Sequence, residues 1–251
     1  MSPDNANDKA YREHRILVAL RRLLERGLCF NFVTVVLSGT SGDDDCMELV
    51  MEKSGERLSE RRTMTVAQLR EMLFQLLYAL DVAQRELRFV HYDLHSKNVL
   101  VEDLERGTAC AIALADGRVF YSQHVLVKIA DFALSSIELD GESICNPKHA
   151  MRGAFDPGYD VCSFAPYLNE AERFKISDRL EQVEAMRLLA QLKRDMKSSS
   201  RNAPGLLLQH VFFSPLLVKP KNAQVILSAS PGEETTAELP RARSPRRSAI
   251  H

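Results

Sequence analysis

The residues with the clearest capacity for chemistry lie in a short polar segment between two apolar runs. The segment spans residues 89–101 and carries two histidines, an aspartate, a lysine and an asparagine, at His91, Asp93, His95, Lys97 and Asn98. Carboxylate and imidazole groups are the usual general acids and bases of enzymes. The flanking apolar residues are β-prone, so we expect a strand–loop–strand unit that presents a catalytic loop.

A metal-binding pair is a second interpretation of the same segment. His91 and His95 form an H-x-x-x-H spacing, which places both imidazoles on one face if the segment is helical. Val90 and Val99 favour strands instead, and Tyr92 stands where the metalloprotease motif needs a glutamate. A polar hairpin without chemistry is the third interpretation of the loop alone. We favour the catalytic loop because of the motifs that follow it.

The order of residues in the loop resembles the protein-kinase signature H-R-D-L-x-x-x-N. The matching positions are His91, Asp93, Leu94 and Asn98. Tyr92 replaces the usual arginine, and His95 replaces the usual lysine, so that D-L-H-x-x-N resembles the haspin-like branch and kinase-like proteins of large DNA viruses. The resemblance implies that Asp93 orients the attacking hydroxyl, that Asn98 binds Mg²⁺ and that His95 assists charge near the γ-phosphate.

Further motifs follow in the family's order. Residues 129–134 resemble the D-F-G segment with alanine in place of glycine, which implies that Asp131 binds Mg²⁺ on the phosphates of ATP. Asp160 resembles the buried aspartate that accepts hydrogen bonds from the catalytic-loop backbone, although the bare pattern also suits an N-cap. Arg201 and residues 206–213 resemble the closing segment of many kinase domains.

The segments before the loop resemble part of a kinase small lobe. Apolar residues at helical spacing predict a helix over residues 10–26, which resembles the C-helix with Glu13 as its lysine-pairing glutamate. Taken alone, Glu13 is an ordinary solvated helix charge. Residues 30–37 and 47–52 are expected strands.

The second of these strands resembles the hinge strand, although an ordinary buried strand explains its apolar residues equally well. The resemblance implies that Met51 is the gatekeeper and that Glu52 and Ser54 contact adenine through their backbones. It also implies that Leu100, on the strand after the catalytic loop, lies beneath the adenine.

Other patterns predict the elements that position the loop. Thr65 and Gln68 form a capping box before a wide apolar stripe, which predicts a long buried helix. Asp116 and Gly117 between apolar runs predict a hairpin. Residues 135–159 are expected to be irregular. A further helix is expected over residues 177–196, with inward side chains at Leu180, Val183, Leu188, Leu189 and Leu192.

Composition limits the class of protein. The 251 residues are 45% hydrophobic and 27% charged, and the 33 basic and 34 acidic residues nearly cancel, so neither nucleic acid nor a membrane is an expected partner. No apolar run is long enough for a membrane span or signal peptide, which predicts a soluble intracellular protein of the cytoplasm or nucleus, or of a host cell if viral. The five cysteines lack C-x-x-C spacing and are expected to be reduced.

Together, the motifs predict an α+β fold that resembles a bilobal protein kinase. The expected parts are a flexible N-terminus (1–9), a truncated β-rich small lobe (10–54), a mainly helical large lobe (55–217) with a hairpin insert at 108–130, and a disordered tail (218–251). The resemblance implies ATP and Mg²⁺ as cofactors and a Ser or Thr hydroxyl of a protein as substrate.

A non-catalytic pseudokinase that binds protein partners is the alternative. The twelve residues before Glu13 contain no glycine, and their only lysine is Lys9, so we expect neither the Gly-rich loop nor the strand-three lysine of the family. The sequence indicates no oligomeric state.

Overall fold

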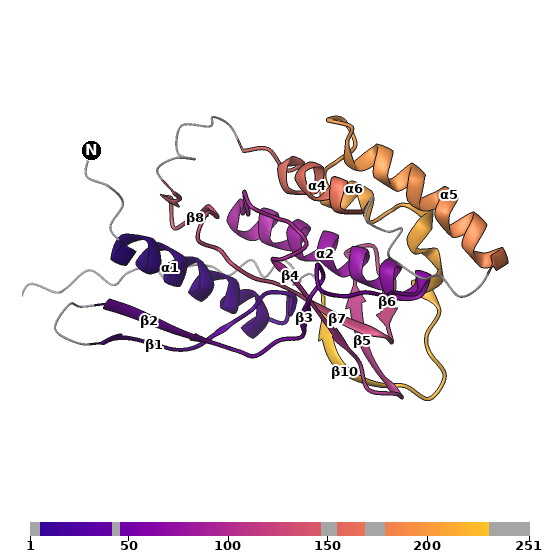
Figure 1. Ribbon diagram of the computed structural model, residues 1–251, viewed down its shortest axis with the longest axis horizontal. Helices are drawn as coiled ribbons and strands as arrows, with labels where there is room; N and C mark the ends of the chain where they lie inside the picture. The colour runs from indigo at the N-terminus through magenta and orange to yellow at the C-terminus, as the bar shows by residue number, and fades with distance from the viewer. Residues whose placement is uncertain (1–5, 42–45, 147–154, 169–178, 231–251) are drawn as a thin grey trace, which may run out of the picture.

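The computed structural model describes residues 6–41, 46–146, 155–168 and 179–230. It has the mixed helix and strand content expected of an α+β protein (Figure 1). In chain order, the elements are α1 (Ala6–Glu25), β1 (Val35–Ser41), β2 (Cys46–Met51), β3 (Glu56–Arg57), α2 (Val66–Leu87), β4 (Val99–Asp103), β5 (Thr108–Ala113), β6 (Val119–Ser122), β7 (Val125–Ile129), β8 (Ile137–Leu139), β9 (Glu142–Ile144), α4 (Tyr159–Phe164), α5 (Arg179–Met196), α6 (Pro204–Leu207), the 3-10 helix η2 (Val211–Leu217) and β10 (Gln224–Ala229).

Helix α2 forms the centre of the core. Its start is the predicted capping box: the Thr65 hydroxyl accepts the Gln68 N–H, and the Gln68 side chain accepts the Thr65 N–H. Most of its residues are buried, because α2 contacts β7 on one side and α6 and η2 on another. Figure 1 shows α2 between the strands β3, β4 and β7 and the helices α4, α5 and α6.

Helix α1 confirms the first predicted helix and begins four residues earlier than expected. It ends at Glu25, Gly27 then adopts φ +67°, and the Leu28 N–H donates to the Leu23 carbonyl oxygen at 2.8 Å. The helix packs against β1 and β2, an antiparallel pair. The strand expected from residue 30 begins only at Val35, because residues 31–33 hydrogen-bond to Ile129 of β7 instead.

The remaining strands form small sheets. Strand β4 pairs with β3 on one edge and antiparallel with β7 on the other. The predicted hairpin is confirmed as β5 and β6, with Gly117 at φ +83° in its turn. The apolar run 119–129 is divided into two strands, since Gln123 and His124 turn the chain from β6 into β7.

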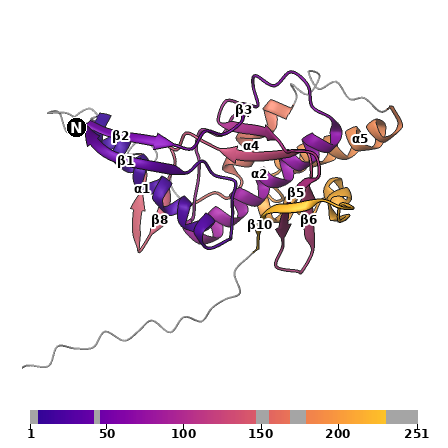
Figure 2. The same cartoon turned by 90° about the horizontal axis from the view of Figure 1, so that it is seen from below.

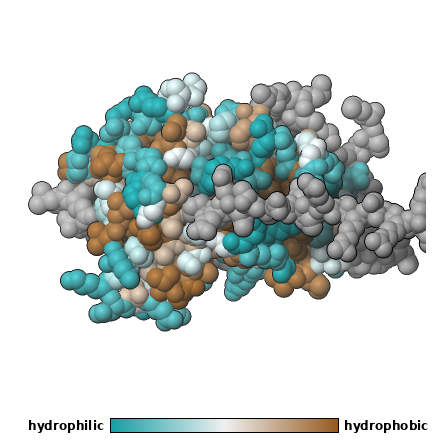
Figure 3. All heavy atoms as spheres, turned by 180° about the vertical axis from the view of Figure 1, so that it is seen from behind, coloured by the Kyte–Doolittle hydropathy of each residue, from teal (hydrophilic) through white to brown (hydrophobic). Residues whose placement is uncertain are grey.

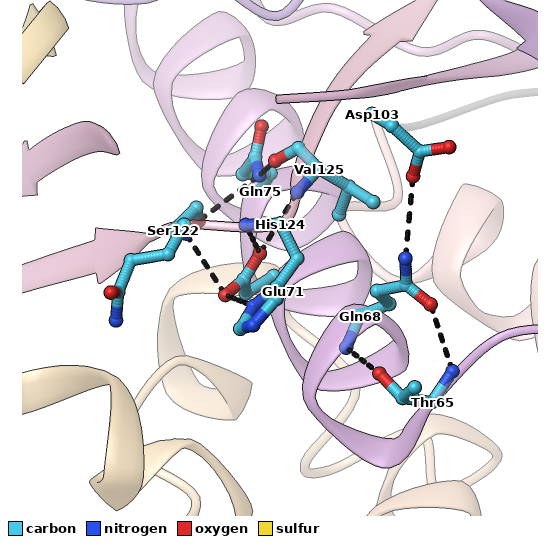
Figure 4. A network of polar contacts seen from close by, with 9 residues as sticks. Thr65, Gln68, Glu71, Gln75, Asp103, Ser122, His124 and Val125 are labelled. Atoms are coloured by element: carbon cyan, nitrogen blue, oxygen red, sulfur yellow. Dashed lines mark hydrogen bonds and ion pairs between the residues drawn. The ribbon is translucent and has the colours of Figure 1, made fainter. Parts of the chain in front are cut away.

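A buried carboxylate on α2 holds that turn (Figure 4). The side chain of Glu71 accepts the N–H groups of Gln123, His124 and Val125 at 2.9–3.0 Å, and His124 Nδ1 lies 2.7 Å from Glu71 Oε1. Gln75, one helical turn later, accepts the Val127 N–H at 3.0 Å and donates to the Val125 carbonyl at 2.8 Å. These contacts fix where β7 begins relative to the core helix.

Two expectations about irregular segments were wrong. Within residues 135–159, strands β8 and β9 form a short hairpin, with Asp140 at φ +52° and Gly141 at φ +81° in its turn. Within residues 218–251, strand β10 pairs in parallel with β5, as Figure 2 shows. The open edge of β5 supplies the hydrogen bonds that order this strand, which its local composition did not indicate. The rest of the expected tail, residues 231–251, lies outside the described part.

Helix α5 confirms the helix predicted before Met196. Leu189 and Leu192 are buried as expected, and Leu188 is half-buried. Val183 is exposed, so its expected inward position was wrong, and the side chain of Leu180 lies outside the described part. The face of α5 that packs on the core is therefore narrower than the apolar pattern suggested.

The surface seen from behind alternates between apolar and polar patches (Figure 3). In the part of the chain that the structure describes, no helix combines the length and apolar character needed to cross a membrane.

Candidate active site

The predicted strand–loop–strand form is confirmed on one side of the loop after α2, whereas the strand expected at Phe89 and Val90 is reduced to a single bridge. Val90 forms an isolated bridge with Ser136, and β4 begins at Val99, directly after Asn98. No helix covers residues 91–95, so the H-x-x-x-H pair does not share a helical face. The loop therefore has the backbone that the catalytic interpretation requires.

Asp160 clamps the start of the loop. Its carboxylate accepts the His91 N–H at 2.8 Å and the Tyr92 N–H at 3.0 Å, while Tyr92 adopts φ +63°. Burial raises the pKa of Asp160 to about 7, and the two backbone N–H donors oppose that rise. Gly158 holds the N-cap position of α4, so the predicted backbone-binding role of Asp160 is confirmed and the N-cap alternative is wrong.

His91 links the loop to the segment after β7. Its Nδ1 accepts the Asp93 N–H at 3.3 Å, and its Nε2 donates to the carbonyl oxygen of Ala130 at 3.0 Å. A ring that accepts at one nitrogen and donates at the other is neutral. Burial lowers the pKa of His91, which favours the same neutral form. Both ring nitrogens are engaged, so His91 serves as a brace between backbone segments rather than as a metal ligand.

Asn98 and Asp131, the two predicted Mg²⁺ ligands, are brought together by the backbone. The Ala130 N–H donates to the carbonyl oxygen of Asn98 at 2.9 Å, which places Asp131 next to it. The Asn98 amide nitrogen donates to the Asp93 carbonyl oxygen at 3.1 Å and so leaves the amide oxygen free of partners within the described residues. Asp131 is exposed at φ +65°, and its carboxylate has no hydrogen bond there. An amide oxygen and a carboxylate are donors that Mg²⁺ accepts.

Asp93 and His95 face each other at the mouth of the loop. The distance from Asp93 Oδ2 to His95 Nε2 is 3.6 Å, and the Asp93 side chain is 42% exposed. His95 Nδ1 accepts the Lys97 N–H at 3.2 Å, so in the neutral ring the proton lies on Nε2 and points toward Asp93. The carboxylate of Asp93 remains open to a hydroxyl group from solvent.

Glu13 reaches this site from α1. Its carboxylate accepts the Phe132 N–H at 3.2 Å, and the Phe132 ring is fully buried between Phe32, Phe89 and His91. Burial, followed by the charge of Asp131, raises the pKa of Glu13. In the described part of the chain, no lysine or arginine forms an ion pair with Glu13. The side chain contacts the D-F-A segment directly instead.

The residues assigned to adenine lie on β2, on β4 and in the segment after β2. Met51 is 43% exposed at the end of β2, and Leu100 is half-buried on β4. The carboxylate of Glu52 accepts the Thr34 N–H at 2.8 Å and binds Lys128 Nζ at 2.7 Å. Its side chain therefore anchors the segment and leaves only its backbone for a ligand.

Ser54, two residues later, has a buried hydroxyl without a hydrogen-bond partner among the described residues. An unpartnered buried hydroxyl carries a desolvation cost, so this oxygen is a group that a bound ligand could satisfy.

Several residues that shape the site were missed from the sequence. Lys128, on β7, is largely buried against Glu52, and Asn31 donates to Gln75 Oε1 at 3.0 Å and to the Val127 carbonyl at 2.8 Å. These residues could have been found as polar residues inside apolar runs. Lys128 interrupts an apolar strand, and Glu71 lies on the buried side of α2. Such residues need a buried partner.

The comparison with known families agrees with this geometry. Residues 28–149 match the family described as haspin-like kinase domain, a stretch that holds the catalytic loop and the D-F-A segment. Over these residues, the chain is similar to haspin-like kinase domains.

Two relatives have kinase names. The chain is 31% identical over 96 residues to a probable kinase of Invertebrate iridescent virus 3, a match that covers 37% of this chain and 18% of that protein. It is 34% identical over 113 residues to a probable serine/threonine-protein kinase of Dictyostelium discoideum, which covers 42% of this chain and 9% of the relative. The matches thus cover less than a fifth of either relative.

Proposed function

We propose that this protein transfers the γ-phosphoryl group of ATP to a Ser or Thr hydroxyl of a protein substrate. The observation that carries the proposal is the backbone link between the catalytic loop and the D-F-A segment, in which Ala130 donates to Asn98 and His91 donates to Ala130. This link joins the two segments that carry Asp93, Asn98 and Asp131, which supports one shared site for the three side chains. The names of the relatives support the same class of reaction.

Each residue has a defined role in the proposed reaction. Asp93 orients the substrate hydroxyl and accepts its proton as the oxygen bonds to the γ-phosphorus and the bond to the β-phosphate oxygen breaks, which releases ADP. Asn98 and Asp131 would hold Mg²⁺, and the ion would neutralise charge on the phosphates. His95 Nε2–H, 3.6 Å from Asp93, is placed to stabilise the carboxylate or a phosphate oxygen.

The nucleotide site follows from the same proposal. Met51, the backbones of Glu52 and Ser54, and Leu100 would surround the adenine, between a small lobe built from α1, β1 and β2 and a large lobe built around α2. The unpartnered Ser54 hydroxyl and the anchored Glu52 side chain support this placement.

A pseudokinase is the second candidate, and one observation favours it. Among the described residues, Glu13 forms no ion pair with a lysine or arginine of a facing strand: the nearby positive charge is Lys9, one turn earlier on α1, and the carboxylate accepts the Phe132 N–H. The lysine that pairs with this glutamate in active kinases fixes the α- and β-phosphates. Loss of one preorganised electrostatic donor typically costs about 10²- to 10³-fold in rate. We therefore expect transfer well below the ordinary kinase level of roughly 1 to 100 per second.

Binding of Mg·ATP to the 251-residue chain separates these outcomes. A formed site should raise the unfolding free energy by about 2.7 kcal/mol at a hundredfold excess over Kd, and Asp131→Asn should remove the Mg²⁺-dependent part. Asp93→Asn should keep the stabilisation and lose transfer. Asp140→Asn is the matched control, because Asp140 is exposed in the β8–β9 turn.

The results discriminate clearly between candidates. Stabilisation by Mg·ATP without transfer supports the pseudokinase, and transfer that disappears in Asp93→Asn supports the kinase. Wild-type transfer in Asp93→Asn, or no binding of Mg·ATP at all, contradicts the assigned site.

A further inference from the structure

A second surface feature lies away from the proposed active site, between α1 and β1. It is a groove of about 280 Å³. Two of its apolar wall residues are unusually open: Val36 is 64% exposed and Leu37 is 66% exposed. The lining residues are His14, Val18, Arg21, Arg22, Glu25, Val35, Val36, Leu37 and Ser38.

Of the charged and polar side chains that line the groove, Arg22 is the one whose interactions need explanation. Arg21 binds Glu25 at 2.9 Å and donates to the Val35 carbonyl oxygen at 3.2 Å, and His14 Nε2 lies 3.0 Å from the Ser38 hydroxyl. Arg22 is exposed, and its guanidinium has no partner among the described residues. A basic residue in the last turn complements the helix dipole, which explains Arg22 alone but not the apolar wall beside it.

The C-terminal part of the chain passes close to one end of this groove. The Ser230 N–H donates to the Gly27 carbonyl oxygen at 3.0 Å, and Gly27 is two residues beyond Glu25. Residues 231–239, which follow, lie outside the described part and have the sequence PGEETTAEL. They contain three glutamates, the apolar pair Ala237 and Leu239, and no lysine or arginine.

The length of this segment suits the groove. Nine extended residues reach up to about 30 Å. The stretch of α1 from Gly27 back to Val18 rises about 14 Å. Its acidic and apolar composition complements the unmatched Arg22 and the open wall formed by Val36 and Leu37.

We propose that residues 231–239 bind in cis in the groove between α1 and β1, with glutamate carboxylates at Arg22 and apolar side chains against Val36 and Leu37. This contact would cover the apolar wall with the chain's own segment. It does not depend on the proposed kinase activity, because none of the groove residues belongs to the candidate active site.

Hydrogen exchange on the full chain tests the proposal, with exchange measured in peptides that cover residues 231–239 and β1. We expect protection of 231–239 in the wild-type chain and a loss of about tenfold or more in Arg22→Gln and Arg22→Glu. Arg62→Glu is the matched control, because Arg62 is an exposed arginine outside the groove. The double variant Glu233→Arg, Glu234→Arg should also lose the protection of residues 231–239. Adding Arg22→Glu to this double variant should restore part of that protection.

Several results would overturn the proposal. One is exchange of residues 231–239 at the same rate in the wild-type and Arg22→Glu chains. Another is protection of residues 231–239 that survives Glu233→Arg with Glu234→Arg, which would show that the glutamates do not hold the segment in the groove. Restored protection in the charge-swapped chain would support the contact, because a simple folding defect would not be rescued by reversed charges.

Discussion

Replacement of Glu71 by glutamine tests the contact that places β7 and, through it, the D-F-A segment. The wild-type carboxylate is 2% exposed and receives four groups, which are three backbone N–H groups and the His124 ring. Glutamine has the same shape but only one oxygen. Its NH₂ group must therefore face two of the donors that the carboxylate accepts.

The expected cost follows from that count. A buried donor left without a partner costs about 1–3 kcal/mol, so two such donors should lower the free energy of unfolding by roughly 2–6 kcal/mol. A cost at the upper end would be a large part of the stability of a typical domain, about 5–15 kcal/mol. The loss should be accompanied by faster hydrogen exchange in β7.

Urea unfolding of the two chains measures this cost. Glu86→Gln is the matched control on the same helix, because Glu86 forms a partly exposed ion pair with Arg26 at 2.7 Å and should change stability by less than about 1 kcal/mol. A loss below about 1 kcal/mol for Glu71→Gln, or equal losses for both variants, would show that the Glu71 contacts do not hold the turn.

The same variant should change the pH dependence of stability. The hydrogen bond to Glu71 raises the pKa of His124 above its ordinary 6.5. A raised folded pKa gives stability that is fully present below pH 6.5 and is lost as pH rises through the folded value. The advantage of the wild-type chain over Glu71→Gln should therefore shrink as the pH is raised above 6.5, and a constant difference from pH 5 to 9 would refute the pairing.

Three further predictions concern the fold around the site. Asp160→Asn should cost about 1–3 kcal/mol, since one of the His91 and Tyr92 N–H groups loses its acceptor. Because the pKa of Asp160 is raised from 3.8 to about 7, the free energy of unfolding of the wild-type chain should fall as the pH rises through this range. Asp160→Asn should remove that fall, and urea titrations at several pH values measure both effects. Gly55→Ala should cost about 1–3 kcal/mol, because an added Cβ would overlap the Val101 carbonyl oxygen, whereas Gly39→Ala, with open space, should be neutral in thermal unfolding. Any transfer activity should survive phosphatase treatment, because Tyr92 stands where many kinases have the arginine that pairs with a phosphate on the segment equivalent to residues 135–159. Loss of activity on this treatment, with a phosphate mapped between residues 135 and 159, would contradict the prediction.

The parts of the fold that local patterns determine were predictable. The capping box at Thr65, the glycine after α1 and the Asp116-Gly117 turn each rest on contacts within a few residues. The β8–β9 hairpin has the same Asp-Gly signal, at Asp140 and Gly141, but the polar, Gly- and Pro-containing composition of residues 135–159 led us to expect no regular structure there.

Long-range contacts account for the other failures. Strand β10 is ordered by the edge of β5, which no local pattern reveals. The roles of the candidate site residues were assigned from the family order and stay predictions, whereas the Asp160 contact with the loop backbone is confirmed. Glu71, Asn31 and Lys128 were missed because a polar residue inside an apolar run signals a buried partner without naming it.

The parallel pairing of β10 with β5 has a consequence for biosynthesis. Residues 224–229 follow β5 by more than a hundred residues, so they complete the sheet long after β5 has left the ribosome, and Ser230 then joins Gly27. Until that moment, the nascent chain carries β5 with an open edge that other strands can pair with. A ribosome that stalls or terminates before residue 224 would therefore release a chain prone to aggregation, even though every residue of the candidate active site had already been made.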